Sequence, residues 1–209
     1  MSTYKWLLDP GHGGMLNGKY TSAPSKMYRF DDGLVFYEGV NNRAIVKKLI
    51  TKLEEACIDF ALVSDAIFDT PLSMRVSMAN LLYAQDKRCI YLSIHSDAMP
   101  PGAHGKGSGF CVFTSVGQTR SDQIAETFSV VYRRELTQFK FRVDRCDGDA
   151  DKEEDFYVLK NTHCPALLVE NLFFDNRREA EFLLSDTGQH QIAKTLFKSI
   201  QEIENQKPI

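Results

Sequence analysis

Residues 89–95 read Cys-Ile-Tyr-Leu-Ser-Ile-His, an almost continuous run of apolar and β-favouring residues. A run without polar alternation is typical of a central strand that is covered on both faces. Residues 4–8 and 166–169 are short runs of similar character, and we predict that they form two further strands. Together these runs predict a buried sheet at the centre of the fold.

The segments between the predicted strands have the apolar spacing of helices. Asn41 or Asn42 could cap a first helix. Thr70-Pro71 predicts the start of a second, with the threonine as its cap and the proline in its first turn. Further helices are expected at 122–136, from about Asn176 and around 192–203, and further strands at 60–63, 109–114 and 156–159. This alternation predicts an α/β fold of one domain over 1–209, with a central, mostly parallel or mixed β-sheet flanked by helices on both faces.

Three segments lack a period and are expected to be loops. Residues 15–33 combine Gly, Ser, Pro, Asn and Lys, and loops of this length are usually functional or mobile. Residues 100–109 are rich in glycine and proline, whereas 144–155 are acidic and hydrophilic. The carboxylates of this last segment could bind calcium, but its glycine is misplaced for an EF-hand loop, which favours an exposed, solvated loop. They are Asp144, Asp147, Asp149, Asp151, Glu153, Glu154 and Asp155.

Composition and charge exclude several classes of protein. The formal net charge of −3 offers neither the basic face that nucleic acid requires nor a polybasic segment for an anionic membrane. No apolar run approaches the roughly 18 residues of a transmembrane helix, and no signal-peptide region precedes the strand at 4–8. We therefore expect synthesis in the cytoplasm without a signal peptide, no nucleic-acid partner and no membrane insertion. We also expect a monomer. Five cysteines without a C-x-x-C pair predict free thiols: Cys57, Cys89, Cys111, Cys146 and Cys164.

Polar side chains that could carry chemistry lie where predicted strands end. His12 follows the first strand in a glycine-rich turn, His95 ends the central run, and Glu170 directly follows a third strand. Glu38 lies just before the first long helix. Two imidazoles and one carboxylate that leave a position for water form a known catalytic zinc set, and a second carboxylate can then take a proton. These four residues have the composition of such a site.

Each candidate also has a structural interpretation. His12 could hydrogen-bond its own turn, His95 could be a satisfied core histidine, and Glu38 could be a solvated carboxylate at a helix start. Glu170 is harder to explain in this way, because an acid that follows four apolar residues is costly to bury without a partner.

Four further residues are interpreted as structural. Arg75 is expected to be an ion-pair or cap partner, and His104 a surface histidine beside the site that could also touch substrate. His163 and Cys164 are adjacent in sequence and point apart if the segment is extended, which disfavours a catalytic pair.

Five segments follow one another in a diagnostic order. They are 8–14 (Leu-Asp-Pro-Gly-His-Gly-Gly), Glu38 before a helix, 72–80 (Leu-Ser-Met-Arg-Val-Ser-Met-Ala-Asn), 93–98 (Ser-Ile-His-Ser-Asp-Ala) and 168–176 (Leu-Val-Glu-Asn-Leu-Phe-Phe-Asp-Asn). In this order the chain resembles, over nearly its whole length, the zinc-dependent N-acetylmuramoyl-L-alanine amidases of type 3. The resemblance implies a peptidoglycan hydrolase that cleaves the amide between N-acetylmuramic acid and the L-alanine of the stem peptide. It also implies that His12, Glu38 and His95 bind one Zn²⁺ per chain and that Glu170 is the catalytic acid/base.

The chain departs from the family pattern at three places. Leu172 stands where a glycine is usual after the catalytic glutamate, and Asp97 stands where asparagine is common. The segment from Met15 to Tyr37 is longer and less regular than the usual connection, so Asp31 and Asp32 compete with Glu38 for the ligand role. Glu38 is preferred because it immediately precedes the predicted helix.

Peptidoglycan lies outside the membrane, whereas the sequence shows no export signal. A phage-type endolysin, released for cell lysis by a separate pore-forming protein, fits this best. A mature chain that has lost its leader and an intracellular amidase acting on spore or recycled wall fragments are alternatives. For the activity, the alternatives are a zinc peptidase that cuts within the stem peptide and a catalytically silent peptidoglycan-binding relative.

Overall fold

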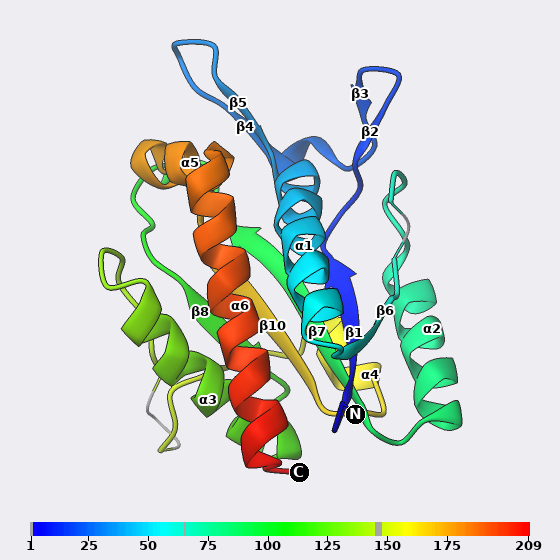
Figure 1. Cartoon of the computed structure of the whole chain (residues 1–209). Helices are drawn as coiled ribbons and strands as arrows, with labels where there is room; N and C mark the ends of the chain where they lie inside the picture. The colour runs from blue at the N-terminus through cyan, green and yellow to red at the C-terminus, as the bar shows by residue number, and fades with distance from the viewer. Residues whose placement is uncertain (1, 65, 145–147) are drawn as a thin grey trace.

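The computed structural model describes residues 2–64, 66–144 and 148–209, and it has the expected α/β architecture (Figure 1). Within these ranges, one mixed sheet has six strands. In spatial order they are β6 (Asp59–Leu62), β1 (Lys5–Pro10), β7 (Cys89–Asp97), β10 (Ala166–Phe173), β8 (Cys111–Thr114) and β9 (Lys152–Glu153). Only the β10–β8 pair of this sheet is antiparallel, which confirms the mostly parallel or mixed sheet.

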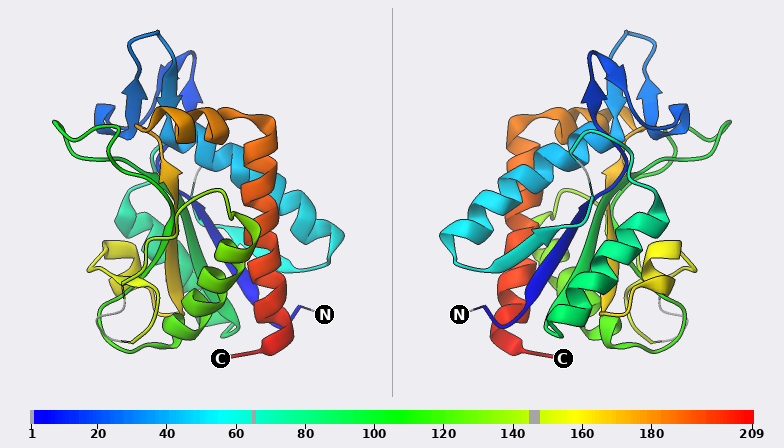
Figure 2. Two further views of the ribbon diagram at one scale, coloured as in Figure 1. Left: turned by 90° about the vertical axis from the view of Figure 1, so that its left-hand side faces the viewer. Right: turned by 90° about the vertical axis from the view of Figure 1, so that its right-hand side faces the viewer.

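Helices cover both faces of the sheet, as Figure 2 shows from two sides. One face carries α1 (Glu38–Glu55), α3 (Arg120–Glu135) and α6 (Asp186–Gln206). The opposite face carries α2 (Leu72–Gln85) and the short α4 (Tyr157–Asn161), which pack against each other. Helix α5 (Arg177–Leu184) joins β10 to α6. The sheet is therefore buried between two hydrophobic clusters.

The side chains of each central strand alternate between these two clusters, as the period of two in a strand requires. In β10, Leu167 and Val169 belong to the cluster under α1, α3 and α6. Ala166 and Leu168 belong to the cluster under α2 and α4. A strand that is apolar on both faces reads as a continuous apolar run, which is why these strands were recognisable in the sequence. By the same alternation, Glu170 points to the α2 and α4 face.

The expected loop at 15–33 contains regular structure. A hairpin of β2 (Met15–Leu16) and β3 (Lys19–Tyr20) is followed by the 3₁₀ turn η1 (Pro24–Lys26). A second hairpin pairs β4 (Met27–Arg29) with β5 (Val35–Tyr37). Both hairpins project from the end of the molecule at which β1 ends (Figure 1). The first one turns at Asn17-Gly18, a pair that favours tight hairpins because both residues adopt positive φ.

Two helix starts differ from the prediction. Helix α1 begins at Glu38, so Asn41 and Asn42 lie buried inside its first turns and do not cap it. The Asn42 side chain donates to the Gly11 carbonyl oxygen at 3.3 Å, which explains a polar residue at a buried position. Helix α2 begins at Leu72 after Pro71, and no side chain caps it.

The predicted strand at 156–159 is wrong. Residues 157–161 form α4 instead, and its Val158 and Leu159 belong to the α2-side cluster. The edge of the sheet next to β8 is occupied by β9, from within the acidic segment, so the 156–159 run has no ladder position there. A four-residue apolar run does not distinguish a strand from a single helical turn.

The acidic segment at 144–155 is not exposed throughout. Besides β9 it contains Asp151, which is buried and accepts a hydrogen bond from Thr114 at 2.5 Å. Asp147 and Cys146 lie outside the described residues. The four described cysteines are free, and three of them are buried, as expected for structural thiols. Within the described ranges no helix combines the length and apolarity needed to cross a membrane.

Candidate active site

His95 and Glu170 lie side by side at the carboxyl end of the sheet. Strands β7 and β10 are parallel, and these two residues are partners in the register. Their neighbours Ile94 and Val169 belong to the α1-side cluster, so His95 and Glu170 both point to the opposite face. Glu170 was expected to follow its strand directly, but it lies within β10, which continues to Phe173.

His12 reaches the same place from the turn after β1. Its φ is 63°, a left-handed conformation that costs about 1–2 kcal/mol for a residue with a side chain. Gly11 permits the close approach, because a Cβ at this position would lie 2.2 Å from Cε1 of the His95 ring. The His12 and His95 rings meet edge to face, with centroids 4.9 Å apart. The strained turn thus holds two imidazoles together.

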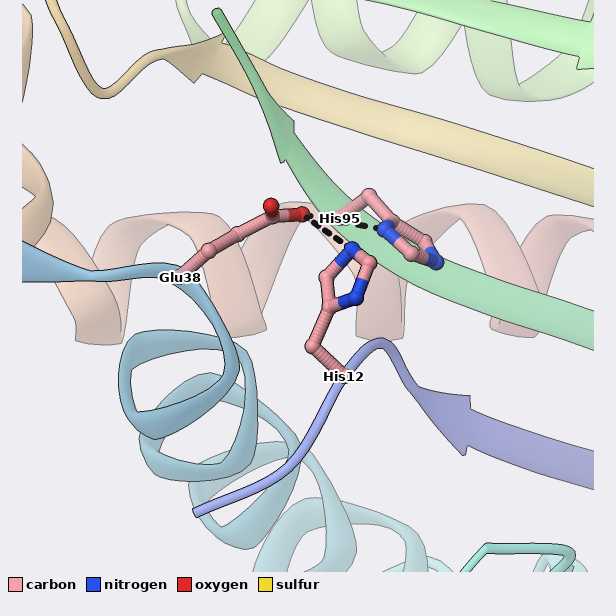
Figure 3. A group of neighbouring side chains, drawn as sticks. All are labelled: His12, Glu38 and His95. Carbon is pink, nitrogen blue, oxygen red and sulfur yellow. Dashed lines mark hydrogen bonds and ion pairs between the residues drawn. The ribbon is translucent and has the colours of Figure 1, made fainter. Parts of the chain in front are cut away.

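Glu38, the first residue of α1, completes the group from the opposite side (Figure 3). Its Oε1 lies 3.0 Å from Nδ1 of His95 and 3.2 Å from Nε2 of His12. The side chain is only 1% exposed. Burial alone would raise the pKa of Glu38, but the contacts with His12 and His95 outweigh burial and lower it. Glu38 is therefore an ionised carboxylate.

The donor set of His12, Glu38 and His95 fits a metal ion. One ligand atom from each residue lies within 4.8 Å of the others. Apart from the 3.2 Å ion-pair contact with Glu38, the buried Nε2 of His12 has no hydrogen-bond partner, and the buried Oε2 of Glu38 lies no nearer to a charged group than 3.9 Å from Nζ of Lys26. Burial lowers the pKa of His12, which favours the neutral imidazole that metals bind. Two imidazoles and one carboxylate match the protein ligands of a catalytic zinc site.

Glu170 faces this group across a cavity of about 340 Å³ that His12 and His95 also line. Its Oε2 is buried without a hydrogen-bond partner. Burial, and then the negative charges of Asp97 and Glu38, raise the pKa of Glu170 well above its ordinary value. A carboxyl group with a raised pKa in a cavity is suited to take up and return a proton.

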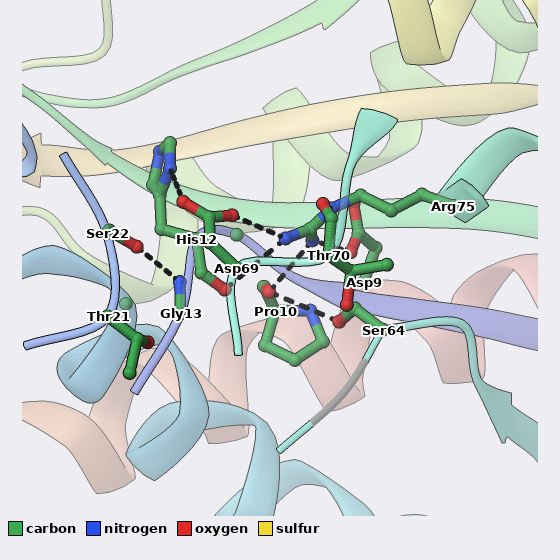
Figure 4. A network of polar contacts seen from close by, with 12 residues as sticks. Asp9, Pro10, His12, Gly13, Thr21, Ser22, Ser64, Asp69, Thr70 and Arg75 are labelled. Atoms are coloured by element: carbon green, nitrogen blue, oxygen red, sulfur yellow. Dashed lines mark hydrogen bonds and ion pairs between the residues drawn. The ribbon is translucent and has the colours of Figure 1, made fainter. Parts of the chain in front are cut away.

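A buried ion-pair network (Figure 4) forms part of the lining of this cavity. Arg75 of α2 pairs with Asp9 at the end of β1, and Asp9 also accepts hydrogen bonds from Tyr91 and Ser93 of β7. Arg75 Nη2 donates to the main-chain oxygen of His12 at 3.3 Å, so the network also holds the His12 turn. The interpretation of Arg75 as an ion-pair partner agrees with this geometry. The sequence analysis did not single out Asp9 as a site residue, although Asp9 follows buried apolar residues just as Glu170 does.

The carboxylates that competed with Glu38 lie apart from the group. Asp31 and Asp32 are exposed, and Asp32 pairs with Arg177. Asp69, which the sequence analysis did not single out, lies closer to the group than Asp31 and Asp32 do. Its Oδ2 is 3.8 Å from Nδ1 of His12, and its Oδ1 is 3.1 Å from Nη2 of Arg75. It is therefore placed to support the orientation of the His12 ring.

The remaining candidates have structural surroundings. His104 Nδ1 lies 3.3 Å from Oδ2 of Asp175, and His104 lines a second cavity, of about 360 Å³. His163 is exposed, whereas Cys164 is buried. Burial raises the pKa of the Cys164 thiol to about 12, which opposes the thiolate that catalysis would need.

Comparisons with known proteins agree with this geometry. A family model described as N-acetylmuramoyl-L-alanine amidase matches residues 7–202. The endolysin of Bacillus phage SPP1 is 29% identical over 214 residues, which cover 99% of this chain and 68% of the endolysin. The N-acetylmuramoyl-L-alanine amidase CwlM of Bacillus licheniformis is 28% identical over 193 residues, which cover 91% of this chain and 64% of CwlM.

Solved structures of low sequence identity share the fold. The N-acetylmuramoyl-L-alanine amidase AmiC2 of Nostoc punctiforme is 24% identical, with a TM-score of 0.74 over 96% of each chain. An N-acetylmuramoyl-L-alanine amidase from Clostridium difficile 630 is 22% identical, with a TM-score of 0.75 over 99% of this chain and 100% of that one. At these identities the likeness concerns the architecture.

Proposed function

The chain belongs to the N-acetylmuramoyl-L-alanine amidase family, and we propose that it hydrolyses the amide between N-acetylmuramic acid and L-alanine in peptidoglycan. The observation that carries the proposal is the meeting of His12, Glu38 and His95 beside Glu170. The two histidines line one cavity with Glu170, whose Oε2 is buried without a hydrogen-bond partner. This arrangement supports hydrolysis, because it combines a metal-type donor set with a proton-transfer group.

We assign one zinc ion per chain to His12, Glu38 and His95. When bound, zinc supplies Lewis acidity, which polarises a carbonyl oxygen and acidifies water. Buried Glu38 brings the negative charge that offsets the cation, while a ring nitrogen of each of His12 and His95 brings a lone pair. Arg75 holds the His12 turn through its hydrogen bond to the main-chain oxygen of His12, and Asp69 accepts a hydrogen bond from Arg75. This supporting network corresponds to the outer partners that orient metal-binding histidines.

Glu170 handles the proton in this proposal. Its carboxylate removes a proton from the attacking water, whose oxygen forms the new bond to the lactyl carbonyl carbon. The same carboxyl group then gives that proton to the nitrogen of L-alanine as the carbon–nitrogen bond breaks, because amines leave poorly unless they are protonated. The products are a carboxyl group on the muramoyl side and a free amino group on L-alanine.

The biological setting remains part of the proposal. Similarity to a phage endolysin supports action on the cell wall. We propose that the chain acts there after release from the cytoplasm, as a monomer and with residues 1–209 as a single catalytic domain. The chain spans 68% and 64% of the two curated relatives described above, so their other activities and partners are not carried over.

The test compares the wild-type chain with Glu170→Gln on purified sacculi. Zinc content is measured on both proteins, and new amino termini are identified after digestion. We expect one zinc per chain in both, new L-alanine amino termini from the wild type, and a loss of turnover of at least about 100-fold in the variant. Glu126→Gln, on the exposed side of α3, is the control and should retain wild-type turnover.

Each result has a distinct meaning. Bound zinc without new amino termini in the wild type would contradict the amidase assignment and favour a silent relative. New amino termini other than L-alanine would favour a peptidase that cuts within the stem. Near-normal turnover by Glu170→Gln would remove Glu170 from the proton-transfer role.

A further inference from the structure

Two cavities meet at Glu170. The first, of about 340 Å³, and the second, of about 360 Å³, share Glu170 and Lys26 among their lining residues. An amide bond held at Glu170 therefore has one cavity available on either side. Since the substrate differs in chemistry on the two sides of this bond, the two cavities can distinguish its direction.

The exposed surface of the first cavity is mainly apolar, although Asp9, Asp69, Arg75 and Ser93 also line it. Leu72 from the start of α2 and Phe156 and Tyr157 from the start of α4 form its apolar and aromatic wall, over the more deeply buried Val158 and Leu168. Phe156 and Tyr157 are 37% and 45% exposed, and Leu72 is 53% exposed. Large apolar side chains so exposed beside a reactive site are suited to contact a ligand.

This wall is held firmly by the fold. The Phe156 ring packs on Phe113 of β8, with centroids 5.1 Å apart, and α4 packs against α2 and β10. An aromatic surface fixed in this way loses little conformational entropy when a ligand covers it.

A larger share of the exposed surface is polar in the second cavity than in the first. Ser96, Asp97 and His104 line it together with Glu38, beside apolar residues of segment 98–101 and Phe174. Asp97 forms an ion pair with Arg142 at 2.8 Å, and His104 lies beside Asp175. Such groups are suited to the backbone amides and terminal charge of a peptide.

We propose that the cavity walled by Leu72, Phe156 and Tyr157 receives the muramoyl sugar, while the stem peptide extends into the cavity lined by Asp97 and His104. The inference rests on the proposed amidase function. The sugar side of the bond is uncharged and presents ring C–H faces and the methyl groups of its N-acetyl and lactyl substituents, which pack favourably on aromatic rings. A cavity of about 340 Å³ is at the lower end of the size range for small-molecule sites, which suits one sugar residue.

The test uses two soluble substrates with the same scissile amide. One is an N-acetylmuramoyl-L-alanyl peptide, and the other is the D-lactoyl-L-alanyl peptide without the sugar. For Phe156→Ala/Tyr157→Ala, we expect kcat/KM on the muramoyl peptide to fall about tenfold or more, mainly through KM. On the lactoyl peptide it should stay within about twofold of wild type. Tyr157→Phe should retain the preference for the sugar, because it keeps the ring.

The control is Leu81→Ala, which removes an equally exposed apolar side chain of α2 that lines neither cavity. It should leave both substrates unaffected. Circular dichroism verifies folding, and Tyr157→Ala alone replaces the double variant if that variant unfolds. Equal losses on both substrates would overturn the sugar assignment. So would a loss that depends on peptide length, which would reverse the direction of binding.

A binding measurement separates this inference from the proposed function. The uncharged methyl amide of N-acetylmuramic acid is titrated into zinc-loaded Glu170→Gln with and without Phe156→Ala/Tyr157→Ala, and we expect at least tenfold weaker binding without the rings. Unchanged binding would contradict the sugar site even if the wild type is an active amidase. If the wild type releases L-alanine amino termini from neither substrate, the amidase proposal itself fails.

Discussion

Leu172 has a left-handed backbone, with a φ of 65°, two residues after Glu170. The register between β10 and β7 shifts between Glu170 and Phe173, so the strand is irregular at this point. Asn171, at the same irregularity, donates to the main-chain oxygen of His95 at 3.1 Å and accepts from Tyr132 at 3.0 Å. The strained turn therefore connects Glu170 to the strand of His95. It also explains why glycine, which adopts positive φ at little cost, is usual here.

Replacement of Leu172 tests this strain. Leu172 is fully buried, so Leu172→Ala should lower the free energy of unfolding by about 2–5 kcal/mol. Leu172→Gly loses the same side chain but relieves the left-handed backbone, and we expect it to be about 1 kcal/mol more stable than Leu172→Ala. Denaturant unfolding measures both. Leu167, buried in the regular part of β10, is the control, because there alanine should be more stable than glycine. The same order at Leu172 would show that no strain is relieved.

The ligand roles of the two histidines are also tested one residue at a time. His12→Ala or His95→Ala should lose both bound zinc and at least about 100-fold in activity, because each removes one of the three proposed protein ligands. Zinc content after dialysis and amidase activity are measured together. His190→Ala, which removes an exposed histidine of α6, should change neither. Stoichiometric zinc in His12→Ala would contradict its assignment as a ligand.

At the scale of elements, the Asp9–Arg75 pair fastens α2 to the end of β1. Both side chains are at least 98% buried, and Arg75 also donates to the carbonyl oxygens of Thr70 and Pro10. Burial alone would raise the pKa of Asp9, but the Arg75 charge and the hydrogen bonds from Tyr91 and Ser93 outweigh it and lower the pKa. Because of this ion pair, the free energy of unfolding depends on pH.

Asp9→Asn should lower the free energy of unfolding by about 3–5 kcal/mol at neutral pH, because it leaves a buried guanidinium without its counter-charge. The folded protein binds the Asp9 proton less tightly than the unfolded chain does. The stabilisation is therefore complete above the unfolded pKa of about 3.9 and is lost as the pH falls through the lower folded pKa. When the free energy of unfolding is measured between pH 7 and pH 2, it should fall less steeply toward low pH in the variant than in the wild type. Asp59→Asn, in a half-exposed pair with Arg88, should cost no more than about 1 kcal/mol.

Helices and strands could be predicted where a single physical cause determines the pattern of apolar residues. The strands at 89–97 and 166–173 are apolar because both of their faces are buried, and the long helices carry a wide apolar stripe. The shorter elements were not predicted correctly. The hairpins, with strands of two or three residues, and the single-turn helix at 157–161 form because of contacts with neighbouring parts of the fold. The Asn17-Gly18 pair is a local hairpin signal that the prediction could have used.

The whole molecule determines what local sequence could not reveal. His12, Glu38, His95 and Glu170 could be singled out by residue type and by their places beside strands or a helix. Their proximity depends on the strand order β1-β7-β10, which places three strand ends next to one another, and on the docking of the α1 start against the His12 turn. Strand order is set by packing between segments that are distant in sequence. It therefore cannot be predicted from the hydrophobic periodicity within one segment.

The two hydrophobic clusters also predict how the molecule responds to metal removal. Neither cluster contains His12, Glu38 or His95, so the sheet and its helices are held without the metal. After chelation the far-ultraviolet circular dichroism should persist while activity is lost and returns with zinc. At a free zinc concentration a thousand times the Kd, zinc binding should raise the free energy of unfolding by about 4 kcal/mol. In a chain of this size that corresponds to a rise in Tm of roughly 10 °C.

His12→Ala is the control for this shift, because zinc should leave its Tm unchanged if the ligand assignment holds. Unfolding of the wild type on chelation alone would mean that the metal organises the core, as in a structural zinc site. Retained activity in the metal-free protein would instead remove the metal from catalysis. A Tm that rises with zinc in the wild type but not in His12→Ala would tie the metal to this cavity, because both proteins share the same core and differ in one ligand.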